Sequence, residues 1–127
     1  MLLLDTTVLI DALRGRPAAD RLRALRNDDV PYACAINVEE VMRGIFEHET
    51  RAVSAFLAGL RIVSLGFDEG EMAGTWRREY AERGVTLSQA DCLVAAASVS
   101  IGATLATGNP TDFPMPEVTV EHWPVGL

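Results

Sequence analysis

Lysine is absent from this chain of 127 residues, so all 11 of its basic side chains are arginines. Without lysine there can be no P-loop of the G-x-x-x-x-G-K type and no lysine nucleophile or Schiff base. The arginines are also outnumbered by 18 acidic residues, which gives a formal net charge of −7. Proteins that attract nucleic acid by general electrostatics rely on a basic surface. The composition therefore disfavours such binding, unless a local group of arginines and bound cations offset the acids where a phosphate arrives.

Cysteine and histidine are also scarce, with two residues of each. Cys34 and Cys92 lie among apolar neighbours without C-x-x-C spacing, so we expect two buried, reduced thiols. His48 and His122 each stand alone, without a second metal-binding residue at helical spacing. These patterns make zinc an unexpected metal for this chain.

Long hydrophobic runs are missing too, although 49% of the residues are hydrophobic. No apolar stretch reaches the roughly 18 residues that a membrane helix needs. Residues 1–5 lack the basic region of a signal peptide and reach an acid after three leucines. We therefore expect a cytoplasmic protein with no membrane association, folded as one domain over residues 1–127.

Short apolar segments alternate with amphipathic ones along the chain, which is the pattern of an α/β fold. Strands are predicted at residues 2–4, 32–35, 61–65 and 103–106, with an edge strand at 118–120. Helices are predicted at residues 7–13, 18–26, 51–59, 68–84 and 90–101, with another after residue 37 and a turn at 27–29. The predicted fold is a central, mostly parallel sheet of about four to five strands, flanked by helices on both faces.

Three segments have the form of a helix-capping box, in which a polar side chain is followed three residues later by an acid. They begin at Asn37, Asp68 and Ser88. The last of them leads into residues 90–101, where Asp91 is the only charged residue. A helix that is apolar almost all round is predicted to lie in the core.

Four acids are predicted to meet at one edge of the sheet. Asp5 follows the first predicted strand, Glu40 the second and Asp112 the fourth, while Asp91 begins the apolar helix. Ligand sites of parallel α/β sheets form outside the carboxyl ends of the strands. Converging carboxylates repel one another unless cations bind, and Mg²⁺ prefers hard oxygen ligands. The pattern therefore predicts a Mg²⁺ site, with Mn²⁺ as the alternative ion.

Each of these acids also has a purely structural explanation. Glu40 and Asp91 fall three residues after a capping residue, where a carboxylate faces the positive end of the helix dipole. Asp5 could cap the helix that follows it, and Asp112 could be a turn residue after Pro110. The joint occurrence of the four favours the functional interpretation, as does the cost of placing a lone acid on an apolar helix.

The segments around these acids resemble the signature blocks of PIN-domain ribonucleases, and more narrowly those of the VapC toxins of toxin–antitoxin pairs. One block alone is a weak signal, whereas four in the family's order, across nearly the whole chain, are specific. The blocks are Leu4-Asp5-Thr6-Thr7-Val8-Leu9-Ile10-Asp11, Glu40-Val41-Met42-Arg43-Gly44, Asp91-Cys92-Leu93-Val94-Ala95-Ala96-Ala97 and Thr107-Gly108-Asn109-Pro110-Thr111-Asp112-Phe113.

The resemblance implies that Asp5, Glu40, Asp91 and Asp112 form a catalytic acidic quartet that binds Mg²⁺. Asp5 and Asp91 would be the most direct ligands. Glu39 is a rival to Glu40, but Glu40 has the family's spacing to the glycine that follows.

By the same resemblance, Thr7 and Asn109 would hold the acids in place or contact the water at the metal. The implied activity is endoribonuclease: water activated by the metal attacks the phosphorus in line, and the products carry a 5′ phosphate and a 3′ hydroxyl. The implied partners are RNA as substrate, a VapB-type antitoxin as inhibitor and a second copy of the chain in a homodimer.

Three other functions fit part of the pattern. A PIN nuclease with a housekeeping role in RNA processing would share the site but lack an inhibitor. A phosphoacceptor signalling domain also gathers acids at strand ends, but it uses a lysine that this chain lacks. A catalytically inactive binding module is disfavoured because all four acids are present.

Overall fold

Five strands form one parallel sheet in the computed structural model, which describes residues 1–25 and 29–126. The strands are β1 (Leu2–Leu4), β2 (Tyr32–Cys34), β3 (Arg61–Val63), β4 (Thr104–Thr107) and β5 (Val120–His122). Their order across the sheet is β3-β2-β1-β4-β5, so the first strand of the chain is the central one. The pairings β1 with β2, β1 with β4, β2 with β3 and β4 with β5 are all parallel. The predicted parallel sheet is confirmed.

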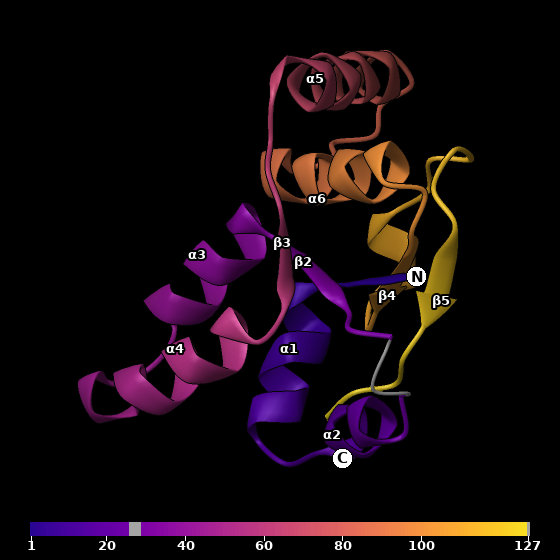
Figure 1. Ribbon diagram of the computed structural model, residues 1–127. Helices are drawn as coiled ribbons and strands as arrows, with labels where there is room; N and C mark the ends of the chain where they lie inside the picture. Colours follow the sequence, from indigo (N-terminus) through magenta and orange to yellow (C-terminus); the bar gives the residue numbers. More distant parts are fainter. Residues whose placement is uncertain (26–28, 127) are drawn as a thin grey trace.

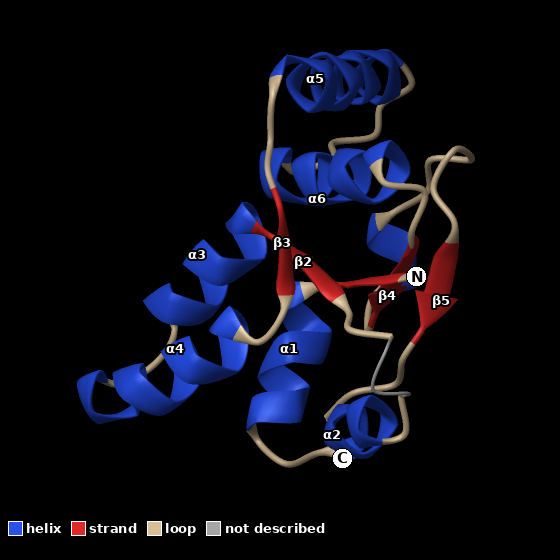
Figure 2. Cartoon of the chain, viewed as in Figure 1, coloured by secondary structure: helices blue, strands red, loops and turns tan. Residues whose placement is uncertain are grey.

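Helices cover both faces of this sheet, as the sequence predicted. Figure 1 shows α5 (Phe67–Glu82) and α6 (Gln89–Ser100) on one side, and α1 (Thr6–Leu13) with α2 (Pro17–Arg23) on the other. The helices α3 (Ala35–Arg43) and α4 (Thr50–Ala58) lie toward the β2 and β3 edge (Figure 2). Two short 3-10 turns, η1 (Glu47–Glu49) and η2 (Pro110–Asp112), complete the elements.

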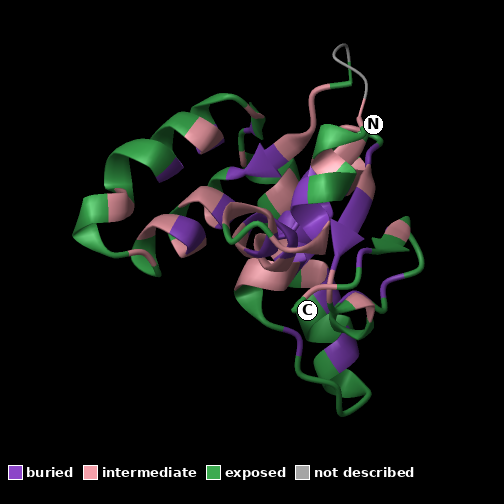
Figure 3. Ribbon diagram, turned by 90° about the horizontal axis from the view of Figure 1, so that it is seen from below, coloured by how far each residue is buried: buried purple, intermediate pink, exposed green. Residues whose placement is uncertain are grey.

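Alternate residues of the central strands pack in two separate hydrophobic cores. Leu3 and Leu105 pack in the cluster beneath α5 and α6, whereas Leu4 and Ala106 pack in the cluster with α1 to α4. Figure 3 shows the buried residues gathered along the strands. Burial of one such leucine contributes about 1.5–3 kcal/mol, so a fully apolar strand stabilises both layers at once. The apolar helix α6 lies in the core as predicted, with residues such as Val94 and Ala96 fully buried.

Two of the three predicted capping boxes are wrong. The helix α3 begins at Ala35, before Asn37, and the Asn37 side chain accepts a hydrogen bond from the Cys34 N–H at 2.9 Å. Asn37 therefore reaches back to the start of the helix from its first turn. The helix α5 begins at Phe67, so Asp68 lies inside it rather than at its cap. Only Ser88 behaves as predicted, because its hydroxyl accepts a hydrogen bond from the Asp91 N–H at 3.0 Å.

Most other predicted boundaries differ from the structure by one or two residues. The edge strand predicted at 118–120 lies at Val120–His122, where its register is fixed by pairing with β4. The second strand is one residue shorter than predicted because Ala35 already belongs to a helix, and the third ends at Val63. The helix predicted at 18–26 is Pro17–Arg23. Its predicted end at Arg26, and the first two residues of the turn at 27–29, lie outside the described residues.

Cys34 and Cys92 are buried free thiols, as predicted. Within residues 1–25 and 29–126, none of the helices has both the length and the apolarity needed to cross a bilayer.

Candidate active site

Three of the four predicted acids follow the carboxyl ends of strands, and the fourth, Asp91, lies at the start of a helix. Asp5 comes directly after β1, and its N–H donates to the Ala106 carbonyl of β4 at 2.9 Å. Glu40 lies in α3, which begins as soon as β2 ends, and Asp91 lies in the first turn of α6. Asp112 ends η2, just beyond β4. The acids therefore come from four different segments to the same end of the sheet.

Asp5 is the buried member of the group, with 6% of its surface exposed. The Thr107 hydroxyl donates to Asp5 Oδ2 at 2.8 Å, and the Thr7 hydroxyl lies 3.4 Å from the same oxygen. Burial raises the pKa of Asp5 above its ordinary value, the Thr107 hydrogen bond lowers it, and the carboxylates of Asp91 and Glu40 raise it again. Hydroxyl groups thus hold Asp5 in place, while burial and the neighbouring carboxylates disfavour its charged form.

The pKa of Asp91 is also affected by other acids of the group. Burial raises its pKa, and the negative charges of Asp112 and Glu40 raise it further, against the lowering effect of a hydrogen bond with the Ser88 side chain. Asp91 therefore has the structural role expected of a capping position, and it also lies within electrostatic reach of two other acids. Its geometry is therefore compatible with both interpretations, the helix cap and the member of an acidic site.

A short relay of hydrogen bonds holds Glu40. The Thr6 hydroxyl donates to Glu40 Oε1 at 2.8 Å, and the Asn37 amide donates to the Thr6 oxygen at 3.0 Å. Asn37 is in turn fixed by the Cys34 N–H at the end of β2. This relay links the carboxyl ends of β1 and β2, and it gives Asn37 a role in the site that its predicted place as a helix cap did not suggest.

Asp112 and Asn109 are the exposed members of the predicted site. The Asn109 N–H donates to the Thr107 hydroxyl at 3.0 Å, so the backbone of Asn109 supports the residue that holds Asp5. Within the described residues, no hydrogen bond is formed by the Asn109 side chain, so its direct role at the acids stays a prediction. Thr7 has the contact to Asp5 that the resemblance implied.

Three supporting residues were missed by the sequence analysis: Thr6, Asn37 and Thr107. Thr107 is fully buried and is the last residue of β4, beside Asp5 at the end of β1. A hydroxyl at the carboxyl end of one strand, next to a strand that is followed by an acid, is the signal that could have identified it. Thr6 and Asn37 gave no comparable signal, because their contact spans 31 residues of sequence.

The donor set fits a hard divalent cation. Its oxygens come from carboxylates and hydroxyls, which suit Mg²⁺ and Mn²⁺ and not softer metals. Within the part of the chain that the structure describes, no three His, Cys, Asp or Glu side chains are close enough to surround an ion by themselves. The acids influence one another's charge without closing into a cage. Such an open group suits Mg²⁺, which keeps several waters and takes one or two carboxylates from the protein.

A groove of about 690 Å³ lies between α1, α3 and α4, beside this site. Val41 and Gly44, which follow Glu40 along α3, form part of its wall. The rest of its lining is largely apolar, with Ile10 and Leu13 from α1 and Val53 from α4. Arg14, His48 and Glu49 also line this groove, and none of the four predicted acids is part of its wall.

Comparison with known proteins gives concordant matches. The sequence matches the PIN domain over residues 2–114. It is 32% identical over 117 residues to Ribonuclease VapC19 of Mycobacterium tuberculosis, covering 91% of this chain and 94% of that protein. It is 33% identical over 116 residues to Ribonuclease VapC10 of the same species, covering 91% and 87%.

Solved structures share the fold. A toxin-antitoxin complex from Klebsiella pneumoniae contains a chain with a TM-score of 0.78 and 28% identity, covering 94% of this chain and 96% of that one. VapBC2 from Rickettsia felis, bound to a DNA fragment from its promoter, gives a TM-score of 0.82 at 21% identity, covering 96% and 98%.

Proposed function

Because this chain belongs to the PIN-domain family, and within it to the VapC ribonucleases, we propose that it is the toxin of a toxin–antitoxin pair and a metal-dependent endoribonuclease. The observation that carries the proposal is the state of Asp5: it is buried at the end of the central strand, and two other carboxylates act on its charge. A fold gains nothing from such an arrangement unless a cation relieves it. The four acids are therefore the proposed site of RNA cleavage.

Asp5 and Asp91 are the proposed principal ligands of Mg²⁺ or Mn²⁺, with Glu40 and Asp112 completing the acidic group. The chemistry that a bound divalent cation supplies is activation of water for attack on phosphorus and neutralisation of charge on the phosphate. Without cations, the four carboxylates would repel an incoming phosphate, so substrate binding depends on the same ions.

The hydroxyls around the acids orient the carboxylate groups. Thr107 and Thr7 direct their contacts to one oxygen of Asp5. Thr6 holds one oxygen of Glu40, and Ser88 fixes the backbone of Asp91. Second-layer contacts of this kind set the direction in which a ligand oxygen points and tune metal affinity.

RNA is the proposed substrate because the relatives at 32% and 33% identity are ribonucleases by name. Attack by water does not use the 2′ hydroxyl of RNA, so the products would carry a 5′ phosphate and a 3′ hydroxyl. We propose residues 1–127 as a single nuclease domain that acts in the cytoplasm as a homodimer. Sedimentation of the purified chain tests the dimer.

Cleavage by purified protein, freed of any antitoxin, tests the proposed activity. A structured RNA should be cut in the presence of Mg²⁺ or Mn²⁺ and left intact in EDTA, and excess Mg²⁺ should restore the cutting. Mass spectrometry of the product ends should find 5′ phosphates. Cleavage that persists in EDTA, or products that end in 2′,3′-cyclic phosphate, would refute metal-dependent hydrolysis by water.

An antitoxin is the proposed inhibitory partner, as in the toxin-antitoxin complex from Klebsiella pneumoniae. An acidic pocket is a natural site for arginine, whose planar guanidinium pairs with carboxylates through two parallel hydrogen bonds. We propose that an antitoxin arginine enters the pocket near Asp5, Glu40 and Asp91. A structure of the complex with the antitoxin wholly away from these acids would contradict this mode of inhibition.

A further inference from the structure

The segment at residues 123–126, which follows β5, lies outside the part of the chain that matches the PIN domain. It begins at the carboxyl end of β4, where the Trp123 N–H donates to the Thr107 carbonyl at 2.9 Å. Trp123 is 3% exposed and packs in the core beneath α1, and the Arg21 guanidinium lies 5.0 Å from the centre of its ring. We call residues 123–126 the C-terminal strap.

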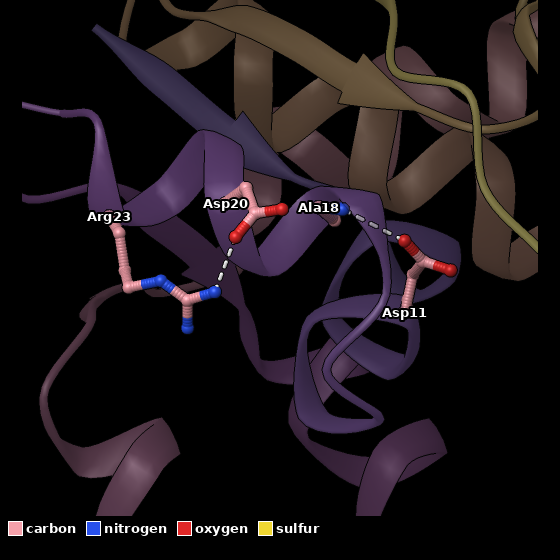
Figure 4. Close-up of polar contacts among 4 residues, drawn as sticks. All are labelled: Asp11, Ala18, Asp20 and Arg23. Carbon is pink, nitrogen blue, oxygen red and sulfur yellow. Dashed lines mark hydrogen bonds and ion pairs between the residues drawn. The ribbon is translucent and has the colours of Figure 1, made fainter. Parts of the chain in front are cut away.

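Asp11 in α1 fixes the other end of the C-terminal strap. Its Oδ1 accepts a hydrogen bond from the Gly126 N–H at 2.9 Å. Its Oδ2 accepts one from the Ala18 N–H at 2.9 Å, which Figure 4 shows. Asp11 is 2% exposed. This buried carboxylate therefore ties together α1, the start of α2 and the C-terminal strap.

Val125, in the middle of the C-terminal strap, packs directly on Gly108. A Cβ atom placed on Gly108 would lie 2.6 Å from one Val125 methyl and 3.3 Å from Thr7 Oγ1. Only glycine fits between these two side chains as they stand. The Gly108 N–H donates to Thr7 Oγ1 at 2.9 Å, so Val125 closes the outer side of this hydrogen bond.

Thr7 and Asp11 are four residues apart in α1 and therefore lie on the same face of the helix. The C-terminal strap contacts this face at both positions, through Gly108 at Thr7 and through Gly126 at Asp11. The strap thus lies along α1 beside the residue that reaches Asp5.

We propose that the C-terminal strap positions Asp5, with Val125 as the positioning residue, by holding Gly108 against the Thr7 hydroxyl. A hydroxyl has one hydrogen to donate, and its oxygen accepts. While Gly108 donates to the Thr7 oxygen, the Thr7 hydrogen is directed at Asp5 Oδ2. The inference rests on the proposed function, in which Asp5 is a metal ligand.

Three variants of the full chain test the strap. Val125→Ala removes the packing on Gly108, and Gly108→Ala forces a methyl group against Val125. The double variant Gly108→Ala/Val125→Ala frees the space that the new methyl needs. Val118→Ala is the matched control, because Val118 is buried in the other core, beneath α5 and α6.

Hydrogen exchange of the Gly108 amide reports on the strap itself, and titration with Mn²⁺ alone reports on the site. In Val125→Ala, the Gly108 amide should exchange about fivefold faster, as loss of roughly one hydrogen bond's net contribution implies. Val125→Ala and Gly108→Ala should each bind Mn²⁺ about tenfold more weakly. The double variant should recover part of the affinity that Gly108→Ala loses, while Val118→Ala should lower the melting temperature with unchanged Mn²⁺ affinity.

If the C-terminal strap only stabilises the fold, the variants should give a different result. If Mn²⁺ affinity is unchanged in Val125→Ala, or falls in Val118→Ala to the same degree, the strap does not position Asp5. If the double variant binds Mn²⁺ no better than Gly108→Ala, direct packing of Val125 on Gly108 is not the cause. If wild type binds no Mn²⁺ and cuts no RNA, the proposed function fails, and the Gly108 exchange rates still decide whether the strap holds the Thr7 contact.

Discussion

Asp5 and Asp11 lie at the two ends of α1, and both are almost fully buried, with 6% and 2% of their surfaces exposed. They differ in what surrounds the carboxylate. Asp11 accepts one backbone N–H on each oxygen, from Ala18 and Gly126. Asp5 accepts hydroxyl hydrogen bonds on a single oxygen. Burial and the charges of two other acids raise its pKa, although hydrogen bonds from Thr107 and from the Thr6 backbone lower it.

The difference shows that burial alone does not reveal why a carboxylate is present. The carboxylate of Asp11 is matched by fixed donors from two other segments, so it stabilises the fold. Burial and the neighbouring acids disfavour the charged form of Asp5 in the folded chain, which supports its proposed role as a ligand of a cation. Loss of the carboxylate should therefore change the stability of the fold in opposite directions at the two positions.

The largest effect is expected for Asp5→Asn. The amide has nearly the same shape and its oxygen can still accept from Thr107, but it no longer supplies a charged ligand. RNA cleavage in Mg²⁺ should fall by roughly a thousandfold or more. Urea unfolding in EDTA should give a stability equal to or above that of wild type, because a disfavoured charge has been removed. A variant that unfolds more easily and still cuts RNA would make Asp5 structural.

The opposite result is expected for Asp11→Ala. Two N–H groups lose a charged acceptor, and the one on Ala18 is buried, so the free energy of unfolding in urea should fall by about 2–4 kcal/mol. The control is Asp20→Ala, because Asp20 forms only an exposed ion pair with Arg23 (Figure 4). Its stability should stay within about 0.5 kcal/mol of wild type. Equal losses of unfolding free energy in the two variants would contradict a specific stabilising role for the buried Asp11 carboxylate.

Mg²⁺ itself should distinguish Asp91 as a ligand from Asp91 as a helix cap. At a Mg²⁺ concentration ten times the dissociation constant, wild type should gain about 1.4 kcal/mol in stability. Asp91→Asn should lose most of this gain and most of the cleavage, while its stability in EDTA stays at or above that of wild type. If Asp91 were only a cap, the variant would instead lose about 0.3–1 kcal/mol in EDTA and keep its response to Mg²⁺.

The smallest effect is a dependence on pH in the absence of metal. The pKa values of Asp5 and Asp91 in the folded chain are raised above 3.8, so the folded state binds protons more tightly than the unfolded state. Their stabilising contribution is fully present below pH 3.8 and is lost as the pH rises through the raised values. In EDTA, wild type should therefore gain stability relative to the double variant Asp5→Asn/Asp91→Asn as the pH falls from 7 to 4. If the stabilities of the two proteins change in parallel with pH, the pKa values of Asp5 and Asp91 are not raised.

The convergence of the acids could be predicted from the sequence because it depends on strand direction. Once the segments of β1, β2 and β4 are assigned to a parallel sheet, their carboxyl ends must share an edge. The apolar character of α6 likewise determined its place in the core. These predictions need only the type of each element and not its contacts.

The supporting contacts could not be predicted in the same way. Asn37 fits the first residue of a capping box by its sequence pattern, yet α3 begins two residues earlier. Its side-chain oxygen accepts from the Cys34 N–H, and its amide nitrogen donates to Thr6, a tertiary contact that spans 31 residues. Thr107 is a β-branched residue in a strand, which propensity alone explains. The tie between Asp11 and Gly126 spans 115 residues, and no local pattern marks it.

The central position of β1 also means that the surroundings of Asp5 are completed late in the synthesis of the chain. The first strand to leave the ribosome is the one that needs neighbours on both sides, and Thr107, which holds Asp5, follows 102 residues later. Contacts so distant in sequence form slowly. A nascent chain that has not yet exposed β4 therefore lacks the hydroxyl that holds Asp5.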